Sequence, residues 1–399
     1  MKKILVVGWD ASLDNFGDKI LIDTVTYLIK KAGDYEAKRL DWVPSKAYWR
    51  LHLIKGCYLK SIQFIVRLFD KFGSYEKNSL LGNIKYTIKK YYYSLKLKKF
   101  YCENMDNIEA VIIAGGAPLK YETQDQSFYT QCLVEATLKN NKPMMINATG
   151  IEQYSNNDIR CIKLIECINN STIKCITTRY DYKKLSENFI KNKSIVIAQV
   201  ADPALWIPET YGIYKRDIGE VIGINLIRNN IFKDYSRYYM ENDDVYNLYI
   251  GIADELERRG YNWRFFCNGM AADYEFGLEV LKRMKKGKEY ILPVAKTTKE
   301  YVNQVAKFKA VIGGRMHATI ASYALGIPVV AFIWSIKMRL FADNAKIGKY
   351  YIEKENITSV NLVDAMEESM KDNDMSEYRK EYRQSTFEYI KRFCDSIQG

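Results

Sequence analysis

The stretch that most constrains the fold is Ala310–Ile333, with the sequence AVIGGRMHATIASYALGIPVVAFI. An apolar run ends at Gly313–Gly314, small residues with helical spacing follow, and a second apolar run begins at Pro328. This order predicts a strand, a tight turn, a helix and a second strand, as in α/β proteins. Glycines permit the sharp turn and leave N–H groups available where the helix begins.

Arg315, Met316 and His317 stand at the predicted start of this helix. The positive end of a helix beside a guanidinium suits a small anion such as phosphate or carboxylate. The alternative is that His317 is an ordinary core histidine and that Arg315 forms a surface salt bridge. Because the chain has only two histidines and one of them stands on a Gly-Gly turn, we favour a functional site.

The length and composition predict a globular protein of two domains. The chain has 399 residues, which exceeds one ordinary core, and 48% of them are hydrophobic. The eight cysteines form no CxxC pair, which predicts a reducing, cytoplasmic compartment and no structural zinc. The longest uncharged stretch, Ala318–Ile336, contains Gly326 and Pro328, so we expect no membrane-spanning helix.

The first half of the chain alternates short apolar strands with helical segments, and polar residues or glycines follow most of the strands. Predicted strands lie at 4–8, 109–114, 142–148, 175–178 and 194–200. Open α/β sheets bind ligands at the carboxyl ends of their strands. The candidate ligand-binding residues in this half are Asn15, Gly17, Asp18, Gly115, Gly116 and Arg179.

A second alternating series begins at residue 221, and its candidate residues are Asn225, Arg228, Asn268 and Lys337. We therefore predict an α/β protein with two Rossmann-like domains facing each other across a cleft, which is a GT-B-like architecture. The predicted parts are an N-terminal domain at 1–206, a linker at 207–218, a C-terminal domain at 219–375 and a helical tail at 376–399.

A basic segment interrupts the first domain at about 45–101. Residues 46–99 contain thirteen Lys or Arg against two acidic residues, and Tyr, Phe and Leu are interleaved at helical spacing. Such helices can lie on an anionic membrane surface. A solvated helical insertion and a nucleic-acid surface are the alternatives, but no nucleic-acid motif is present. We favour a membrane or a lipid-linked partner, at the inner face of the cell membrane, and no nucleic acid.

Several motifs follow one another in a recognisable order across nearly the whole chain outside the basic segment. They are Asn15-Phe-Gly17-Asp18, Ala114-Gly-Gly116, Arg179-Tyr-Asp181, Asp202-Pro-Ala204 and Gly313-Gly-Arg-Met-His317-Ala, followed by Gly326-Ile-Pro328 and Lys337. In this order they resemble the polysaccharide pyruvyl transferase family. The sequence departs from the family pattern at Ala117, where a third glycine is common, and at Tyr180, which separates Arg179 from Asp181.

The resemblance implies transfer of the pyruvyl group of phosphoenolpyruvate to two hydroxyls of a sugar in a cell-surface polysaccharide precursor. The products would be a cyclic ketal and free phosphate. The acceptor sugar would be either free or carried on undecaprenyl diphosphate. We expect no cofactor and no metal, since no His, Asp and Glu cluster with ligand spacing occurs.

The residues suit this chemistry. Phosphoenolpyruvate carries two anionic groups, so Arg315 and Arg179 are candidates for two separate cationic contacts, with the backbone amide of Met316 beside them. His317 titrates nearest neutral pH and is the candidate general acid. Asp18 is a candidate base or acceptor ligand.

A second enzymatic hypothesis is a metal-independent glycosyltransferase of GT-B type that uses a nucleotide sugar. In that case Arg315 and Lys337 would hold the diphosphate, and His317 or Asp18 would act as base. A non-enzymatic member of a membrane assembly is a third possibility, and the joint presence of Arg179, Arg315 and His317 argues against it.

Overall fold

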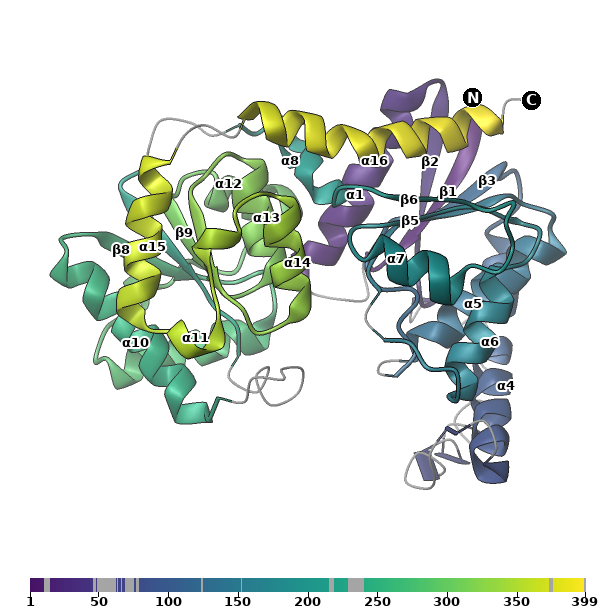
Figure 1. The fold of residues 1–399 in the computed structure, drawn as a ribbon, viewed down its shortest axis with the longest axis horizontal. Coiled ribbons are helices and arrows are strands. Elements are labelled where there is room, and N and C mark those ends of the chain that lie inside the picture. Colours follow the sequence, from purple (N-terminus) through teal and green to yellow (C-terminus); the bar gives the residue numbers. More distant parts are fainter. Residues whose placement is uncertain are drawn as a thin grey trace. The chain divides into compact units, whose positions relative to one another are not determined.

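The structure of the protein is a computed structural model, and the chain forms two compact units (Figure 1). The first unit comprises Met1–Leu13, Val25–Asp202 and Ser385–Gly399, and the second comprises Asp14–Thr24 and Pro203–Gln384. The residues that the structure describes are 1–10, 15–45, 48, 62, 64–65, 67–68, 75–76, 79–122, 125–151, 153–214, 219–228, 240–372 and 376–397.

The first unit is built on a six-stranded parallel sheet with the order β2-β1-β3-β4-β5-β6. Its inner strands are continuous apolar runs because helices cover both faces, and Ile4–Val7 are fully buried. The strands are β1 (Lys2–Gly8), β2 (Tyr35–Asp41), β3 (Ala110–Ile113), β4 (Met144–Thr149), β5 (Ile173–Thr178) and β6 (Val196–Gln199).

The helices of the first unit pack through aromatic side chains. The ring of Tyr93 stacks on Phe128 with centroids 5.3 Å apart, and the hydroxyl of Tyr86 donates to Gln131 over 2.6 Å. These contacts join α4 to α5. The helices are α1 (Phe16–Ala32), whose first turns belong to the second unit, α4 (Leu80–Glu103), α5 (Gln126–Lys139), α6 (Ile159–Ile168) and α7 (Tyr182–Lys184), which continues as the π-helical turn Leu185–Phe189.

The second unit is built on a five-stranded parallel sheet with the order β11-β10-β9-β7-β8. The strands are β7 (Val221–Asn225), β8 (Asn262–Phe266), β9 (Ala310–Gly313), β10 (Val329–Phe332) and β11 (Tyr351–Ile352). The predicted strand, turn, helix and strand at 310–333 are confirmed as β9, α13 (Met316–Ala324) and β10. Two parallel α/β sheets confirm the predicted fold class.

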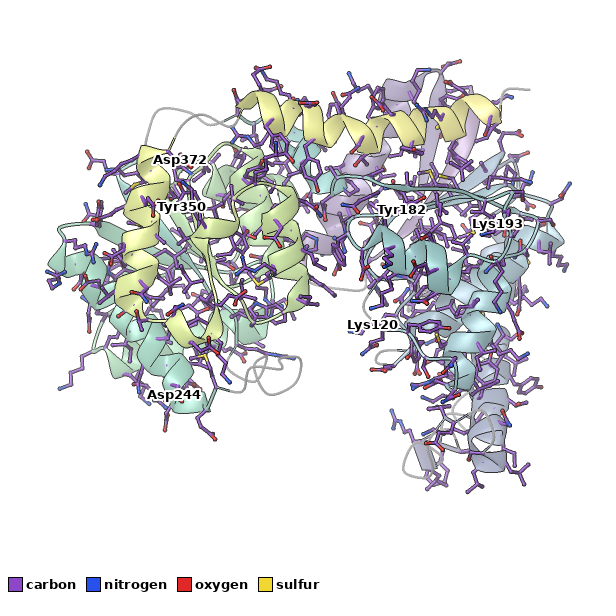
Figure 2. The ribbon with its side chains drawn as sticks, viewed as in Figure 1. Lys120, Tyr182, Lys193, Asp244, Tyr350 and Asp372 are labelled. Carbon is purple, nitrogen blue, oxygen red and sulfur yellow. The ribbon has the colours of Figure 1, made fainter. Side chains whose placement is uncertain are left out.

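Helices surround this second sheet, and the last of them contributes to both units. Beyond α15, the carboxylate of Asp372 accepts a hydrogen bond from the Tyr350 hydroxyl over 2.6 Å (Figure 2). The other helices are α8 (Ile207–Tyr211), α10 (Asn242–Arg258), α11 (Ala271–Arg283), α12 (Thr298–Val305), α14 (Ile336–Asn344), α15 (Ser359–Lys371) and α16 (Ser376–Ser396), with 3-10 turns at Pro203–Trp206, Lys288–Tyr290, Gly348–Tyr350 and Lys354–Asn356.

The Gly-Gly turn after β9 depends on close packing and not on a left-handed backbone, since neither glycine has a positive φ. A Cβ atom on Gly313 would overlap Thr319 Cγ2. One on Gly314 would lie 2.7 Å from both the Asn225 carbonyl oxygen and the Tyr249 hydroxyl. The turn therefore needs glycine because β7 and α13 approach it closely. By contrast, Gly115 and Gly116 after β3 do have positive φ angles.

The compact units divide the chain differently from the predicted domains. Residues 14–24 belong to the second unit, although the predicted N-terminal domain ran without a break from 1 to 206. The carboxylate of Asp23, for example, accepts from the hydroxyls of Tyr211 and Thr298. The predicted linker at 207–218 begins with helix α8, whose first residues are buried, and residues 215–218 lie outside the described part. Within the predicted tail, Ser385 and the residues after it belong to the first unit.

The basic segment presents less exposed charge than its sequence indicates. Of six lysines on α4, Lys85 and Lys89 are buried, and only Lys98 and Lys99 are exposed. Lys89 forms an ion pair with Asp125 over 3.0 Å. These lysines face the rest of the unit because α4 packs on α5. Most of the segment between 46 and 78 lies outside the described residues.

Two further expectations concern the cysteines and membrane crossing. The seven cysteines in the described part of the chain are all free thiols, and Cys57 lies outside that part. Of the helices formed by described residues, none has the length and apolar character needed to cross a membrane.

The burial of Lys89 generates a prediction about stability. Lys89→Glu should lower the free energy of unfolding by about 3 kcal/mol, the range found when a buried ion pair is broken. The new carboxylate would face Asp125, which also accepts a hydrogen bond from Tyr93. Denaturant unfolding followed by circular dichroism measures the change. Lys98→Glu, on the exposed side of the same helix, is the control and should stay within about 0.5 kcal/mol of wild type. Equal midpoints for the two variants would contradict the packing of α4.

Candidate functional site

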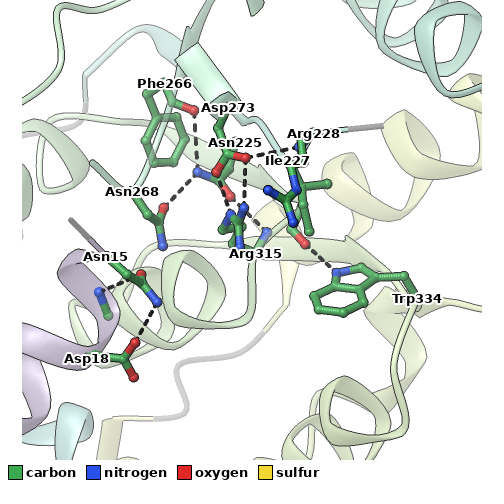
Figure 3. Close-up of polar contacts among 12 residues, drawn as sticks. Asn15, Asp18, Asn225, Ile227, Arg228, Phe266, Asn268, Asp273, Arg315 and Trp334 are labelled. Atoms are coloured by element: carbon green, nitrogen blue, oxygen red, sulfur yellow. Dashed lines mark hydrogen bonds and ion pairs between the residues drawn. The ribbon is translucent and has the colours of Figure 1, made fainter. Parts of the chain in front are cut away.

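The candidate site lies in the second unit, at the carboxyl ends of its three neighbouring strands β9, β7 and β8 (Figure 3). Asn225 ends β7, Asn268 follows β8, and Arg315 follows β9. Parallel strands bring their carboxyl ends to one edge of a sheet, which is where such folds bind ligands. The structure thus brings together three residues that were predicted separately.

Two buried asparagines link these strand ends. Asn225 Oδ1 accepts from the backbone N–H of Arg315 over 2.8 Å, and Asn225 Nδ2 donates to Asn268 Oδ1 over 2.9 Å. The Tyr301 hydroxyl donates to the same Asn268 oxygen over 3.0 Å. Burial raises the pKa of Tyr301, so its hydroxyl remains a donor. Because Asn268 Oδ1 receives two donors, the orientation of both amides is fixed.

Arg315 is held by Asp273, a residue of α11 that was not among the predicted site residues. Arg315 Nε lies 2.5 Å from Asp273 Oδ2, and Arg315 NH2 lies 2.7 Å from Oδ1. Asp273 is fully buried, and its Oδ1 also accepts from the backbone N–H of Arg228 over 3.0 Å. The carboxylate therefore fixes both predicted arginines of this edge, one through its side chain and one through its backbone.

The N-terminal motif Asn15–Asp18 belongs to this site and covers the end of β8. The backbone N–H of Phe16 donates to the Asn268 carbonyl over 2.9 Å, and the Phe16 ring stacks on Tyr301 at 5.5 Å. Asn15 Oδ1 accepts from the backbone of Gly17, and Asn15 Nδ2 donates to Asp18 Oδ2 over 2.8 Å. Asn15 thus orients the Asp18 carboxylate.

His317 lies directly against this motif. It is the second residue of α13, half-buried, and a Cβ atom on Gly17 would overlap its Nδ1 atom. Only glycine leaves room for the imidazole at this position. The sequence predicted Gly17 and His317 as separate candidates, and the structure places them in contact.

Three further residues follow strands of this sheet, namely Met316, Lys337 and Cys267. Met316 is the first residue of α13, so its N–H lies among those that the helix leaves without an internal partner. Lys337 is half-buried in the first turn of α14. Burial raises the pKa of the Cys267 thiol to about 11, so this cysteine is protonated at neutral pH and is a poor nucleophile.

Three predicted site residues belong to the first unit and not to this cluster. Gly115 and Gly116 follow β3, and Arg179 follows β5. Arg179 is buried, its NH1 lies 2.5 Å from Asp202 Oδ2, and its NH2 donates to the Gly116 carbonyl over 3.2 Å. The motifs around Arg179, Asp202 and Gly116 therefore form one polar cluster of their own.

Among the residues that the structure describes, no group of three or more His, Cys, Asp or Glu is arranged to hold a metal ion. The expectation that the protein works without a metal stays a prediction. The second-unit site consists of arginine, asparagine, aspartate, histidine and glycine, whereas the first-unit cluster consists of Arg179, Asp202 and the backbone of Gly116. Such an arrangement can bind an anion and can transfer a proton.

The two parallel α/β sheets with their helices are the two Rossmann-like domains of the GT-B class. The family model for polysaccharide pyruvyl transferase matches residues 15–336. The chain belongs to this family. No curated protein matches the chain in sequence.

Solved structures similar to this chain include enzymes that act on nucleotide sugars. One is the UDP-GlcNAc 2-epimerase from Neisseria meningitidis bound to UDP-GlcNAc, with a TM-score of 0.53, 11% identity, and 100% of this chain and 99% of that chain covered. The UDP-GlcNAc 2-epimerase of Methanocaldococcus jannaschii, in complex with UDP-GlcNAc and UDP, has a TM-score of 0.52, 9% identity, and 94% of each chain covered. A UDP-glucosyltransferase from Polygonum tinctorium has a TM-score of 0.52, 7% identity, and 100% and 99% covered. At these identities the likeness concerns the fold alone.

The contact between Gly17 and His317 generates a prediction. Gly17→Ala should displace the imidazole and lower the free energy of unfolding by about 1–3 kcal/mol, the usual effect of overpacking. The chain has two histidines, so the imidazole NMR spectrum has two sets of signals. One set should shift in the variant. Gly33→Ala, near the end of the same helix, is the control, because its Cβ would meet only the Tyr35 ring, at 3.1 Å. An unchanged imidazole spectrum in Gly17→Ala would show that the two residues are not in contact.

Proposed function

We propose that the protein transfers the pyruvyl group of phosphoenolpyruvate to two hydroxyls of one sugar in a cell-surface polysaccharide precursor. The observation that carries the proposal is the placement of the Asn15–Asp18 motif against α13 in one compact unit. A family that is named for pyruvyl transfer and a site with an acid, a base and an anion-binding helix end support the same reaction.

The anionic donor has suitable contacts at this edge. The start of α13 provides backbone N–H groups at the positive end of a helix. Arg315 directly precedes that helix and its guanidinium is held by Asp273, and Lys337 lies in the first turn of α14. These groups can bind the phosphate or the carboxylate of the donor. The donor-binding role of Arg179 stays a prediction.

His317 and Asp18 provide the proton transfers. The reaction adds one proton to the methylene carbon, and both sugar hydroxyls lose theirs. Two C–O bonds form at the central carbon and its bond to the phosphate oxygen breaks, which yields a cyclic ketal that carries a methyl group. Of the two hydroxyl protons, one balances the proton that the carbon gains and the other leaves with the phosphate. We assign the carbon protonation to His317 and the first hydroxyl proton to Asp18, which Asn15 orients.

The alternative is a metal-independent glycosyltransferase that uses a nucleotide sugar. The observation that favours it is the fold, which is shared with a UDP-glucosyltransferase from Polygonum tinctorium. A fold of this kind hosts many reactions, so the fold does not decide between them. The two donors differ in the product that they release, phosphate in one case and a nucleotide in the other.

Phosphate release is the test. Wild-type protein with phosphoenolpyruvate and a panel of sugar acceptors should release phosphate only when an acceptor with two suitable hydroxyls is present. Phosphoenolpyruvate, and not a nucleotide sugar, should raise the melting temperature. His317→Asn should fold normally and lower the rate of phosphate release about 10²–10⁴-fold, as for loss of a positioned acid.

Two outcomes would contradict this assignment. Stabilisation by UDP-sugars together with nucleotide release would establish the glycosyltransferase. Full activity of His317→Asn would remove His317 from the mechanism while leaving the reaction itself in place.

We also propose peripheral contact with an anionic membrane through α4. Lys98 and Lys99 are exposed, as are the apolar side chains of Leu80, Leu81 and Ile84 on the same helix. The protein should pellet with anionic vesicles at low salt, dissociate as salt rises, and ignore neutral vesicles. Replacing both lysines by Glu should weaken pelleting. Failure of the wild-type protein to pellet with anionic vesicles would make this segment an ordinary solvated insertion.

A further inference from the structure

The guanidinium of Arg315 is already partly occupied inside the protein. Of its five N–H donors, the one on Nε and one on NH2 point to the carboxylate of Asp273 at 2.5 and 2.7 Å. Three donors, two on NH1 and one on NH2, take no part in this pair. The side-on edge of the guanidinium, formed by Nε and NH2, is therefore used by the protein itself, and only the end-on edge formed by NH1 and NH2 remains for two-point contact with a carboxylate or phosphate.

We propose that Asp273 is a positioning residue that converts Arg315 from a cationic clamp into a directed hydrogen-bond donor. This proposal rests on the proposed function in taking the donor anion to bind at the start of α13. The paired side chains carry no net charge together. An anion at this edge is recognised by the direction of the remaining N–H groups and by the helix end, and only weakly by the charge of Arg315.

The burial of the pair supports this role. Asp273 is fully buried and the Arg315 side chain is 14% exposed, so water screens their interaction little. Asp273 Oδ1 also accepts the backbone N–H of Arg228, so the carboxylate is fixed independently of Arg315. Asn225 fixes the Arg315 backbone from the opposite direction. Arg315 is thus held at its backbone by Asn225 and at its guanidinium by Asp273 before any ligand arrives.

Pre-organisation of this kind favours turnover over simple binding. A guanidinium that cannot turn keeps its donors aimed at one place, and misplacement by about 1 Å can lower a rate about 100-fold. Removing the negative charge of Asp273 has the opposite effect on binding, because Arg315 regains an unopposed charge that attracts any anion. Replacing a residue that is needed only for folding would instead lower turnover and anion affinity together.

The test uses Asp273→Asn, which keeps the shape of the side chain and removes its charge. Inorganic phosphate is the probe, titrated by calorimetry at low and high salt. The variant should bind phosphate about tenfold more tightly than wild type, with a steeper loss of affinity as salt rises. Its turnover of phosphoenolpyruvate should fall about 10–100-fold.

Glu209→Gln is the matched control in the same unit. Glu209 pairs with Arg383 through two contacts, of 2.6 and 2.7 Å, at a place remote in sequence from the candidate site. This variant should lose stability without any change in phosphate affinity or turnover. If Asp273→Asn does not fold, Asp273→Glu keeps the charge and moves it by one methylene, and should lower turnover while leaving phosphate affinity unchanged.

Several results would overturn the proposal. They are unchanged or weaker phosphate binding in Asp273→Asn, unchanged phosphoenolpyruvate turnover in an otherwise active enzyme, or no phosphate binding by either wild type or variant. The phosphate titration does not require catalysis. Wild-type protein that never acts on phosphoenolpyruvate would therefore refute the proposed function, whereas the titration would still decide the role of Asp273.

Discussion

The buried carboxylate of Asp273 is the constraint on which the candidate site depends. A carboxylate removed from water needs cations and N–H donors in place of its hydration shell. Arg315 and the backbone of Arg228 provide them, which ties the ends of β7 and β9 to the start of α11. Three elements that are distant in sequence meet at one side chain, and the geometry of the candidate anion-binding edge follows from that meeting.

The first unit repeats this arrangement with different residues. Asp202, which is 2% exposed, follows β6 and pairs with Arg179, which follows the neighbouring strand β5. In both units an arginine at a strand end is held by a buried aspartate from beyond another strand. Each sheet edge therefore carries a neutralised arginine with part of its guanidinium uncommitted to that pair. Arginine is suited to this double use because its five donors lie in one plane.

Much of the fold could be predicted because buried parallel strands are continuous apolar runs. Strand β2 was missed, since its charged residues Glu36, Lys38 and Arg39 hide an edge strand in which only Tyr35 and Leu40 are buried. The buried state of Lys85 and Lys89 was also hidden, because lysines at helical spacing look the same whether they face solvent or another helix. Asp273 lies 42 residues before Arg315, and no local sequence pattern around it predicts that the two residues form an ion pair.

Residues 14–24 belong to the second unit, and this places the N-terminal motif Asn15–Asp18 beside the Gly-Gly-Arg-Met-His motif at 313–317. Phe16 joins β8 through its backbone N–H, which nearly any residue type provides, so the side-chain pattern gives no sign of the contact. The residue types on either side of Phe16 are explained only by their contacts in the folded structure. Gly17 leaves room for His317, and Asn15 turns the Asp18 carboxylate. From the sequence, Asn15–Asp18 was assigned to the loop after the first strand of the N-terminal domain. In the structure these residues belong to the second unit and form part of its candidate site.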